Sequence, residues 1–152
     1  MKRMDKMITI LLVTLVVAVL SVTAIIIFNR NTYKTPIKKL YEAINEKSVE
    51  KLANTYHPCL SKNEAFKTEL ESQLAPIKNY NFKYEYTIKK SRTLSKKELE
   101  EYKNNYKYVC KIKVEKAYEV EVSQTTIVNN EKSTDNKKIL VGLIDGKWYL
   151  IK

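Results

Sequence analysis

The sequence predicts an α+β domain that follows one hydrophobic segment. Three observations carry this prediction: an uncharged apolar stretch near the N-terminus, helical spacing of apolar residues up to about residue 74, and alternation with a period of two through most of the remainder. Because helices come first and strands follow, the pattern is typical of α+β layers and not of alternating βαβ units. We expect about three helices packed on a curved antiparallel sheet of about four strands.

The apolar stretch runs from Met7 to Phe28, which is 22 residues. A helix of that length reaches about 33 Å and can cross a hydrocarbon core of about 30 Å. We therefore predict a tail at 1–6, a transmembrane helix at 7–28, a linker at 29–34 and the domain at 35–152. The alternative is a cleaved signal peptide with a cleavage site at Val22-Thr23-Ala24, although the apolar run continues beyond that site.

The orientation of the segment follows from its flanks. Lys2, Arg3 and Lys6 form a short basic tail that is readily retained in the cytoplasm. A long C-terminal domain translocates largely regardless of its charge. We expect a single-pass protein of the cell membrane, with its N-terminus in the cytoplasm and its C-terminal domain outside.

The chain beyond the apolar segment is basic. From residue 29 onward it has 25 Lys and Arg against 16 Asp and Glu, a net charge of +9. Such a charge attracts anionic partners. However, the basic residues are spread along the chain and nearly all are lysine, which recognises phosphate less specifically than arginine. The composition argues against nucleic acid. From the predicted anchor and its location we expect the membrane, and envelope proteins or self-association, as partners.

Cys59 and Cys110 are the only cysteines of the chain. There is no Cys-x-x-Cys pair, so neither a zinc site nor thioredoxin chemistry is supported, and we predict no metal and no cofactor. In an exported domain the two cysteines can form a disulfide, whereas in a reducing environment both are small buried hydrophobic residues. The sequence alone leaves both possibilities open.

Helix starts are indicated by capping signals. Thr35-Pro36 is typical of an N-cap followed by the first helical residue, and Ser48 can cap a second helix. His57-Pro58 stops that second helix, because the residue before proline avoids helical geometry.

Two capping boxes follow. Ser61-Lys-Asn-Glu64 predicts a helix that ends near Leu74, and Ser95-Lys-Lys-Glu98 predicts a short helix that ends near Asn104-Asn105. Leu94 and Leu99 have the spacing of a hydrophobic staple around the second box.

Alternation predicts the strands. Apolar and polar residues alternate from Phe82 to Ile88 and again from Tyr106 to Val122, the latter as one bent strand or as two strands broken by a bulge near Lys116. Residues 129–136 are expected to form a polar loop. Asp145-Gly146 lies between two apolar runs and predicts a final hairpin.

Three stretches carry a resemblance to a known family. They are the opening helical pair from Pro36 to Pro58, the tyrosine-rich alternating strands, and the terminal Asp145-Gly-Lys-Trp-Tyr-Leu150. On these residues the segment 35–152 resembles the nuclear-transport-factor-two-like (cystatin-like) superfamily, and it is most similar to small membrane-tethered members from Gram-positive bacteria. The resemblance implies a cone-shaped domain. The same fold occurs in extracytoplasmic domains of conjugation and type IV secretion proteins, so the fold alone does not fix function.

Enzymes of that superfamily place an Asp-His pair, or an Asp base with tyrosine donors, inside the cone. Here His57 is the only histidine and lies beside a proline, and the strand glutamates have the polar parity. A general base needs burial or a charged neighbour, so we predict no catalytic residue. Five strand tyrosines can instead line a ligand cavity, or simply cover a half-buried sheet face: Tyr84, Tyr86, Tyr106, Tyr108 and Tyr118.

The sequence therefore indicates a membrane-anchored extracytoplasmic domain that binds a ligand or another protein and is not an enzyme. The alternative is an assembly component of a conjugation or type IV secretion channel. A third reading is a cavity enzyme of the isomerase or dehydratase type, which would need a buried carboxylate facing the tyrosines.

Overall fold

The computed structural model describes residues 32–151, and for residues 103–109 it describes only the course of the helix. A compact unit begins at Tyr33. The expected tail and transmembrane helix, and most of the linker, lie outside the described residues. Within 32–151, every helix is too short or too polar to cross a membrane.

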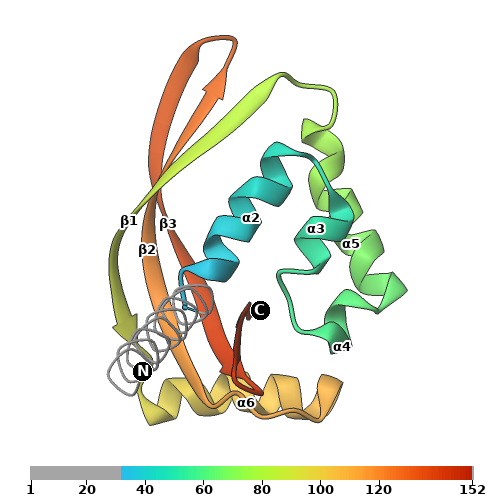
Figure 1. Ribbon diagram of the computed structural model, residues 1–152, viewed down its shortest axis with the longest axis vertical. Helices are drawn as coiled ribbons and strands as arrows, with labels where there is room; N and C mark the ends of the chain where they lie inside the picture. Colours follow the sequence, from blue (N-terminus) through green and yellow to red (C-terminus); the bar gives the residue numbers. More distant parts are fainter. Residues whose placement is uncertain (1–31, 152) are drawn as a thin grey trace, which may run out of the picture. The chain divides into compact units, whose positions relative to one another are not determined.

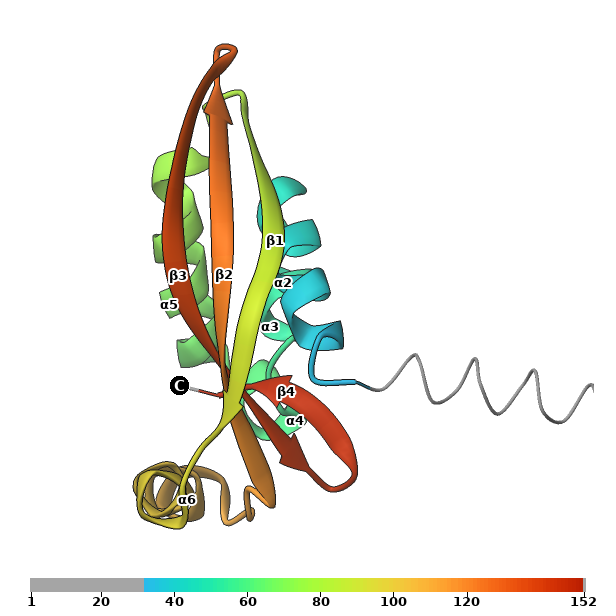
Figure 2. The same cartoon turned by 90° about the vertical axis from the view of Figure 1, so that its left-hand side faces the viewer.

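Helices cover one face of a four-stranded antiparallel sheet, as predicted (Figures 1 and 2). The spatial order of the strands is their order in the chain, and α6 lies across one end of the sheet (Figure 1). The helices are α2 (Thr35–Asn45), α3 (Val49–Ala53), α4 (Pro58–Ser61), α5 (Glu64–Leu74), the 3₁₀ helix η1 (Ala75–Ile77) and α6 (Lys96–Cys110). The strands are β1 (Phe82–Thr93), β2 (Lys116–Val128), β3 (Glu131–Ile144) and β4 (Lys147–Leu150).

The first two helices begin where the sequence favours a helix start. Pro36 lies in the first turn of α2, although Lys34 and not Thr35 occupies the N-cap and makes no side-chain cap hydrogen bond. Ser48 caps α3 as predicted, since its hydroxyl accepts a hydrogen bond from the backbone N–H of Lys51 at 3.2 Å.

The next two helix starts differ from the prediction. α3 ends at Ala53, and the four-residue helix α4 begins after His57, whose Nδ1 accepts a hydrogen bond from the backbone N–H of Cys59. The prediction of a capping box at Ser61 is wrong, because Ser61 is the last residue of α4 and the N-cap of α5 is Asn63. The Asn63 side chain accepts from the backbone N–H of Phe66 at 3.1 Å, and Asn is as good an N-cap as Ser.

The start of α6 is confirmed. The backbone N–H of Glu98 donates to Ser95 Oγ and the backbone N–H of Ser95 donates to a Glu98 carboxylate oxygen, which completes the capping box. Leu94 and Leu99 are both buried, as a hydrophobic staple requires.

The end of α6 corrects the sequence analysis. The helix continues to Cys110, so the residues from Tyr106 to Cys110 are helical and not a strand. The sequence here fits two periods. A spacing of four residues relates Tyr102, Tyr106 and Cys110 and suits a helix, while the alternation of Tyr and Lys suits a strand. A disulfide joins Cys110 to Cys59 and fixes the end of α6 to α4.

The stretch predicted as a polar loop is mostly strand. Asn129 and Asn130 have positive φ angles of 50° and 69° and form a two-residue turn, after which β3 begins at Glu131. Asn tolerates the left-handed conformation that such a turn requires. Pairing with β2 therefore extends the strand through residues 131–136 in spite of their polarity. The hairpin turn at Asp145-Gly146 is confirmed, with φ angles of 49° and 71°.

Register decides which strand residues face the helices. Tyr84 lies opposite Thr126, and Tyr86 opposite Gln124, on the side that contacts α2. The register shifts between Ile88 and Lys90, so the irregularity lies in β1 and not near Lys116.

The buried residues form three groups. One lies between α2 and the sheet and centres on Ile37, Tyr41 and Val120. A second lies among α2, α3 and α5, and a third under α6. The helices are therefore fixed to one another and to the sheet.

Candidate functional site: a cavity between the helices and the sheet

A cavity of about 270 Å³ lies between the helices and the helix-facing side of the sheet. Its walls come from α2, α3, α5, η1, β1 and β2, and from the segment after α3. Six aliphatic side chains, two tyrosines and two glutamines line it: Leu40, Ile44, Leu52, Leu70, Leu74, Ile77, Tyr56, Tyr84, Gln73 and Gln124.

Helical periodicity supplies the aliphatic wall. Leu40 and Ile44 lie one turn apart on α2, and Leu70 and Leu74 lie one turn apart on α5. Side chains four residues apart on a helix occupy the same face, so each helix presents two branched chains to the same space.

Gln124 is held in place by a tyrosine pair. Tyr41 donates a hydrogen bond from its hydroxyl to Gln124 Oε1 at 3.1 Å, and its ring stacks on that of Tyr86 at 4.3 Å. Burial, assisted by the charge of Asp135, raises the pKa of Tyr41 to about 12, so the hydroxyl remains a donor at neutral pH. The hydroxyl of Tyr41 already bonds to the side-chain carbonyl oxygen of Gln124. The side-chain N–H groups of Gln124 remain available to donate a hydrogen bond to a ligand.

Tyr84 is positioned through its backbone. Asn45, the last residue of α2, accepts from the Tyr84 N–H at 2.7 Å and donates to the Tyr84 carbonyl at 2.9 Å. This pair of hydrogen bonds fixes β1 to α2 beside the cavity. On the opposite wall, the Tyr56 ring packs edge-on against Phe66 at 5.0 Å, and burial raises the pKa of Tyr56.

Among the predicted tyrosines whose side chains the structure describes, Tyr84 alone lines the cavity. Tyr86 packs on Tyr41, and Tyr118 packs against the rings of Tyr33 and Trp148. Tyr106 and Tyr108 lie in α6, because that segment is a helix.

Sequence reasoning missed Tyr56 as a lining residue. It lies four residues after Leu52, which also lines the cavity. The same apolar spacing that predicted the second helix therefore already contained this signal.

His57 and Asp145 approach each other, with 3.6 Å between Nε2 and Oδ2. The Nδ1 of His57 accepts from the backbone N–H of Cys59, which assigns the proton of the neutral ring to Nε2. Neither nitrogen then has a free lone pair for a general base. The pair lies outside the set of residues that line the cavity.

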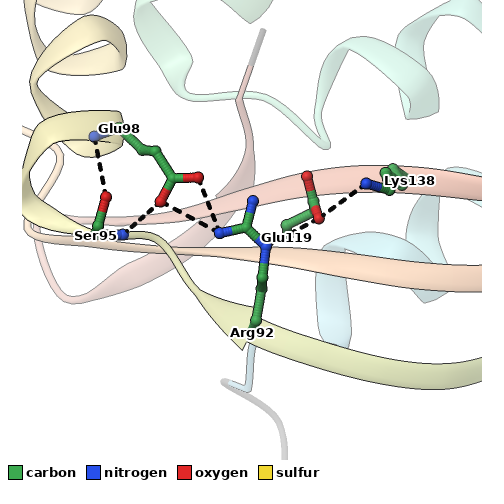
Figure 3. Close-up of polar contacts among 5 residues, drawn as sticks. All are labelled: Arg92, Ser95, Glu98, Glu119 and Lys138. Carbon is green, nitrogen blue, oxygen red and sulfur yellow. Dashed lines mark hydrogen bonds and ion pairs between the residues drawn. The ribbon is translucent and has the colours of Figure 1, made fainter.

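An ion-pair network lies where β1 meets α6 (Figure 3). The Arg92 guanidinium donates to Glu119 at 3.1 Å and to Glu98 at 3.2 Å, and Lys138 Nζ lies 3.3 Å from Glu119. Hydrogen bonds from the Ser95 backbone and hydroxyl, together with Arg92, lower the pKa of Glu98 to about 2.

Glu119 belongs to the same network and is likewise ionised. Its pKa is lowered, chiefly by Arg92. Two carboxylates that stay ionised at neutral pH do not serve as general acids. The role of the network is structural, because its residues come from β1, α6, β2 and β3 and tie these four elements together.

The described part of the chain holds no group of three or more His, Cys, Asp or Glu residues that could bind a metal ion. No family model matches the chain, and neither a curated protein nor a solved structure matches it. The cavity is therefore the candidate site on the basis of its own geometry.

Proposed function

We propose that this chain is a membrane-anchored extracytoplasmic binding domain that holds an uncharged, mainly apolar group in the cavity between its helices and sheet, without catalysis. The observation that carries the proposal is the lining, in which six aliphatic side chains are combined with two tyrosines and two glutamines. Ligand sites are typically concave and apolar with a few polar groups that orient the ligand.

The size of the cavity limits the ligand. An enclosed apolar cavity of about 150 Å³ holds benzene; this one is about 270 Å³, partly open to solvent and lined by both apolar and polar groups. A branched aliphatic group or a bicyclic aromatic group has a size that fits this cavity. The tyrosine hydroxyls and glutamine amides suit one uncharged polar atom on that group.

The lining also supports binding over catalysis. It contains neither a carboxylate nor an imidazole. Asp135 lies on the helix-facing side of β3, opposite Gln124, but it is exposed and paired with Lys137 at 2.6 Å. A solvated, paired carboxylate lacks the burial that tunes a general base.

The extracytoplasmic location rests on two features. The apolar segment 7–28 has the length and composition of a membrane anchor. The disulfide between Cys59 and Cys110 suits an oxidising compartment.

A methyl-labelled NMR titration tests the binding. The full chain in lipid nanodiscs is titrated with indole, an uncharged bicyclic probe with one donor. We expect saturable shifts of the lining methyl groups, while Ile127, on the opposite face of the sheet, stays unchanged.

A cavity-filling variant makes this titration specific. Ile44→Trp places a large ring in the cavity and should abolish the shifts, whereas Ile127→Trp is the matched substitution outside it. Equal shifts in both variants, or no saturable shift in the original chain, would contradict the proposal.

A further inference from the structure

β3 has an edge that is free over most of the strand. β4 pairs only with Val141–Ile144, and the backbone N–H of Ile151 donates to the Leu140 carbonyl. Residues 131–138 are all exposed, and no other described strand pairs with this edge. The β2–β3 hairpin extends beyond the helices, so its end is not covered by them (Figures 1 and 2).

Backbone geometry determines which groups point outward from this edge. A two-residue turn makes Val128 and Glu131 a hydrogen-bonded pair, so odd-numbered residues of this part of β3 bond to β2. The even-numbered residues Lys132, Thr134 and Asn136 direct their N–H and C=O groups away from the sheet. The hydrogen bond from Ile151 to the carbonyl of Leu140, also even-numbered, agrees with this parity.

We propose that two copies of this chain pair through this edge of β3, antiparallel and related by a two-fold axis at Thr134. An open row of backbone donors and acceptors is a template for another strand. In this register Thr134 bonds to Thr134 of the second copy and Lys132 bonds to Asn136 of the second copy. All these residues belong to the outward-pointing set.

Charge complementarity favours this register. Lys137 of each copy lies opposite Glu131 of the other, which creates two acid–base pairs related by the axis. A shift by two residues in one direction places Asp135 opposite Asp135, and in the other direction it places Glu131 opposite Asp135. Like charges directly opposite each other are destabilising, so both neighbouring registers are disfavoured.

The same complementarity favours a second copy as the occupant. A foreign uncharged strand would leave Glu131 and Lys137 without opposite charges across the new ladder. Charged residues along an edge normally discourage pairing, and a second copy in this register turns them into attractive contacts.

The symmetry is compatible with the membrane tether of the proposed function. A two-fold axis perpendicular to the sheet keeps the helix-covered face of both copies on one side. Tyr33 packs on Tyr118 and Trp148 at that face. Tyr33, where the compact unit begins, therefore lies on the same side of the pair in both copies.

Cysteine cross-linking of the full chain in native membranes tests the pairing. Opposite Cα atoms in a hydrogen-bonded antiparallel pair are about 5.5 Å apart, within the range of a disulfide. Thr134→Cys should give a covalent dimer on mild oxidation. Thr125→Cys is the matched control, because Thr125 lies opposite Thr134 on β2. Its two copies would be about 14 Å apart across three strand spacings, and should stay monomeric.

Charge reversal tests the register. In the Thr134→Cys background, Lys137→Glu should reduce the dimer yield about tenfold, because it places acid opposite acid twice. Adding Glu131→Lys should restore the yield, which also shows that the domain is folded. A monomeric Thr134→Cys chain, equal yields at Thr125 and Thr134, or a Lys137→Glu variant that dimerises normally would overturn the proposal.

The cavity assay separates this inference from the proposed function. Neither Glu131 nor Lys137 lines the cavity, so Lys137→Glu should leave indole binding unchanged. A Thr134→Cys chain that binds indole but does not cross-link overturns the pairing alone, whereas a Thr134→Cys chain that cross-links but does not bind indole supports the pairing and contradicts the cavity function.

Discussion

Removing the disulfide between Cys59 and Cys110 should strongly destabilise the domain. The two residues are 51 positions apart, so the bridge closes a long loop in the unfolded chain. In the chain-entropy model a loop of that length is worth about 4 kcal/mol at 25 °C. Since domains are stable by roughly 5–15 kcal/mol, the double variant Cys59→Ser/Cys110→Ser should lose a large share of its stability.

Urea unfolding of the full chain in lipid vesicles measures this loss. Trp148 is the only tryptophan of the chain and packs on Tyr118, so its fluorescence reports on the domain alone. The midpoint should fall in the double variant, and adding reductant should lower the midpoint of the original chain but not that of the variant. A loss of stability below about 1 kcal/mol, far under the loop estimate, would refute the reasoning.

Four further predictions can be tested, three from contacts described above and one from the expected location of the domain. Gly142→Ala should destabilise by about 1–3 kcal/mol in thermal unfolding, because a Cβ there would lie 2.8 Å from Ile151 Cγ2; unchanged stability would contradict this packing. Asn45→Ala should lower stability by about 1–3 kcal/mol, since it leaves the Tyr84 backbone groups without partners; Asn54→Ala, at an exposed helix end, is the control. The pKa of Glu98 is lowered in the folded state, so its contribution is present above about pH 4.5 and is lost as the pH falls towards about 2. Ser95→Ala should therefore raise the pH of acid unfolding, and an unchanged acid midpoint would speak against the cap. Finally, protease treatment of intact cells should remove a C-terminal tag; protection of the tag, with the protease shown to be active, would place the domain inside.

Local signals in the sequence predicted much of the fold. The Ser95–Glu98 capping box, the Ser48 cap and the Asp145-Gly146 turn depend on neighbouring residues, and all three are present. The α+β class followed from the order of the periodic segments, which does not require knowledge of long-range contacts.

The errors arose where the local pattern fits more than one structure. Residues 131–136 are polar enough for a loop, but the ladder with β2 holds them in a strand. The Tyr106–Cys110 segment fits either periodicity, and the continuation of α6 settles it as a helix. In both cases the neighbouring element decides, a hairpin strand across a two-residue turn or the preceding turns of a helix, and a period alone does not identify it.

The candidate site was predicted only in part because its lining depends on contacts between residues distant in sequence. Tyr84 was found because it lies on the helix-facing parity of β1. Tyr86 has the same parity, but its ring is covered by Tyr41 from α2. Which of several inward-facing tyrosines borders a cavity depends on the helix that lies above it.

Intermolecular NOE measurements between bound indole and the full chain test the central claim most directly. We predict NOEs from the indole ring to the methyl groups of Leu40, Ile44, Leu70 and Leu74, which line the cavity from α2 and α5. NOEs confined to other methyl groups, such as that of Ile127 on the opposite face of the sheet, would contradict a binding site between the helices and the sheet.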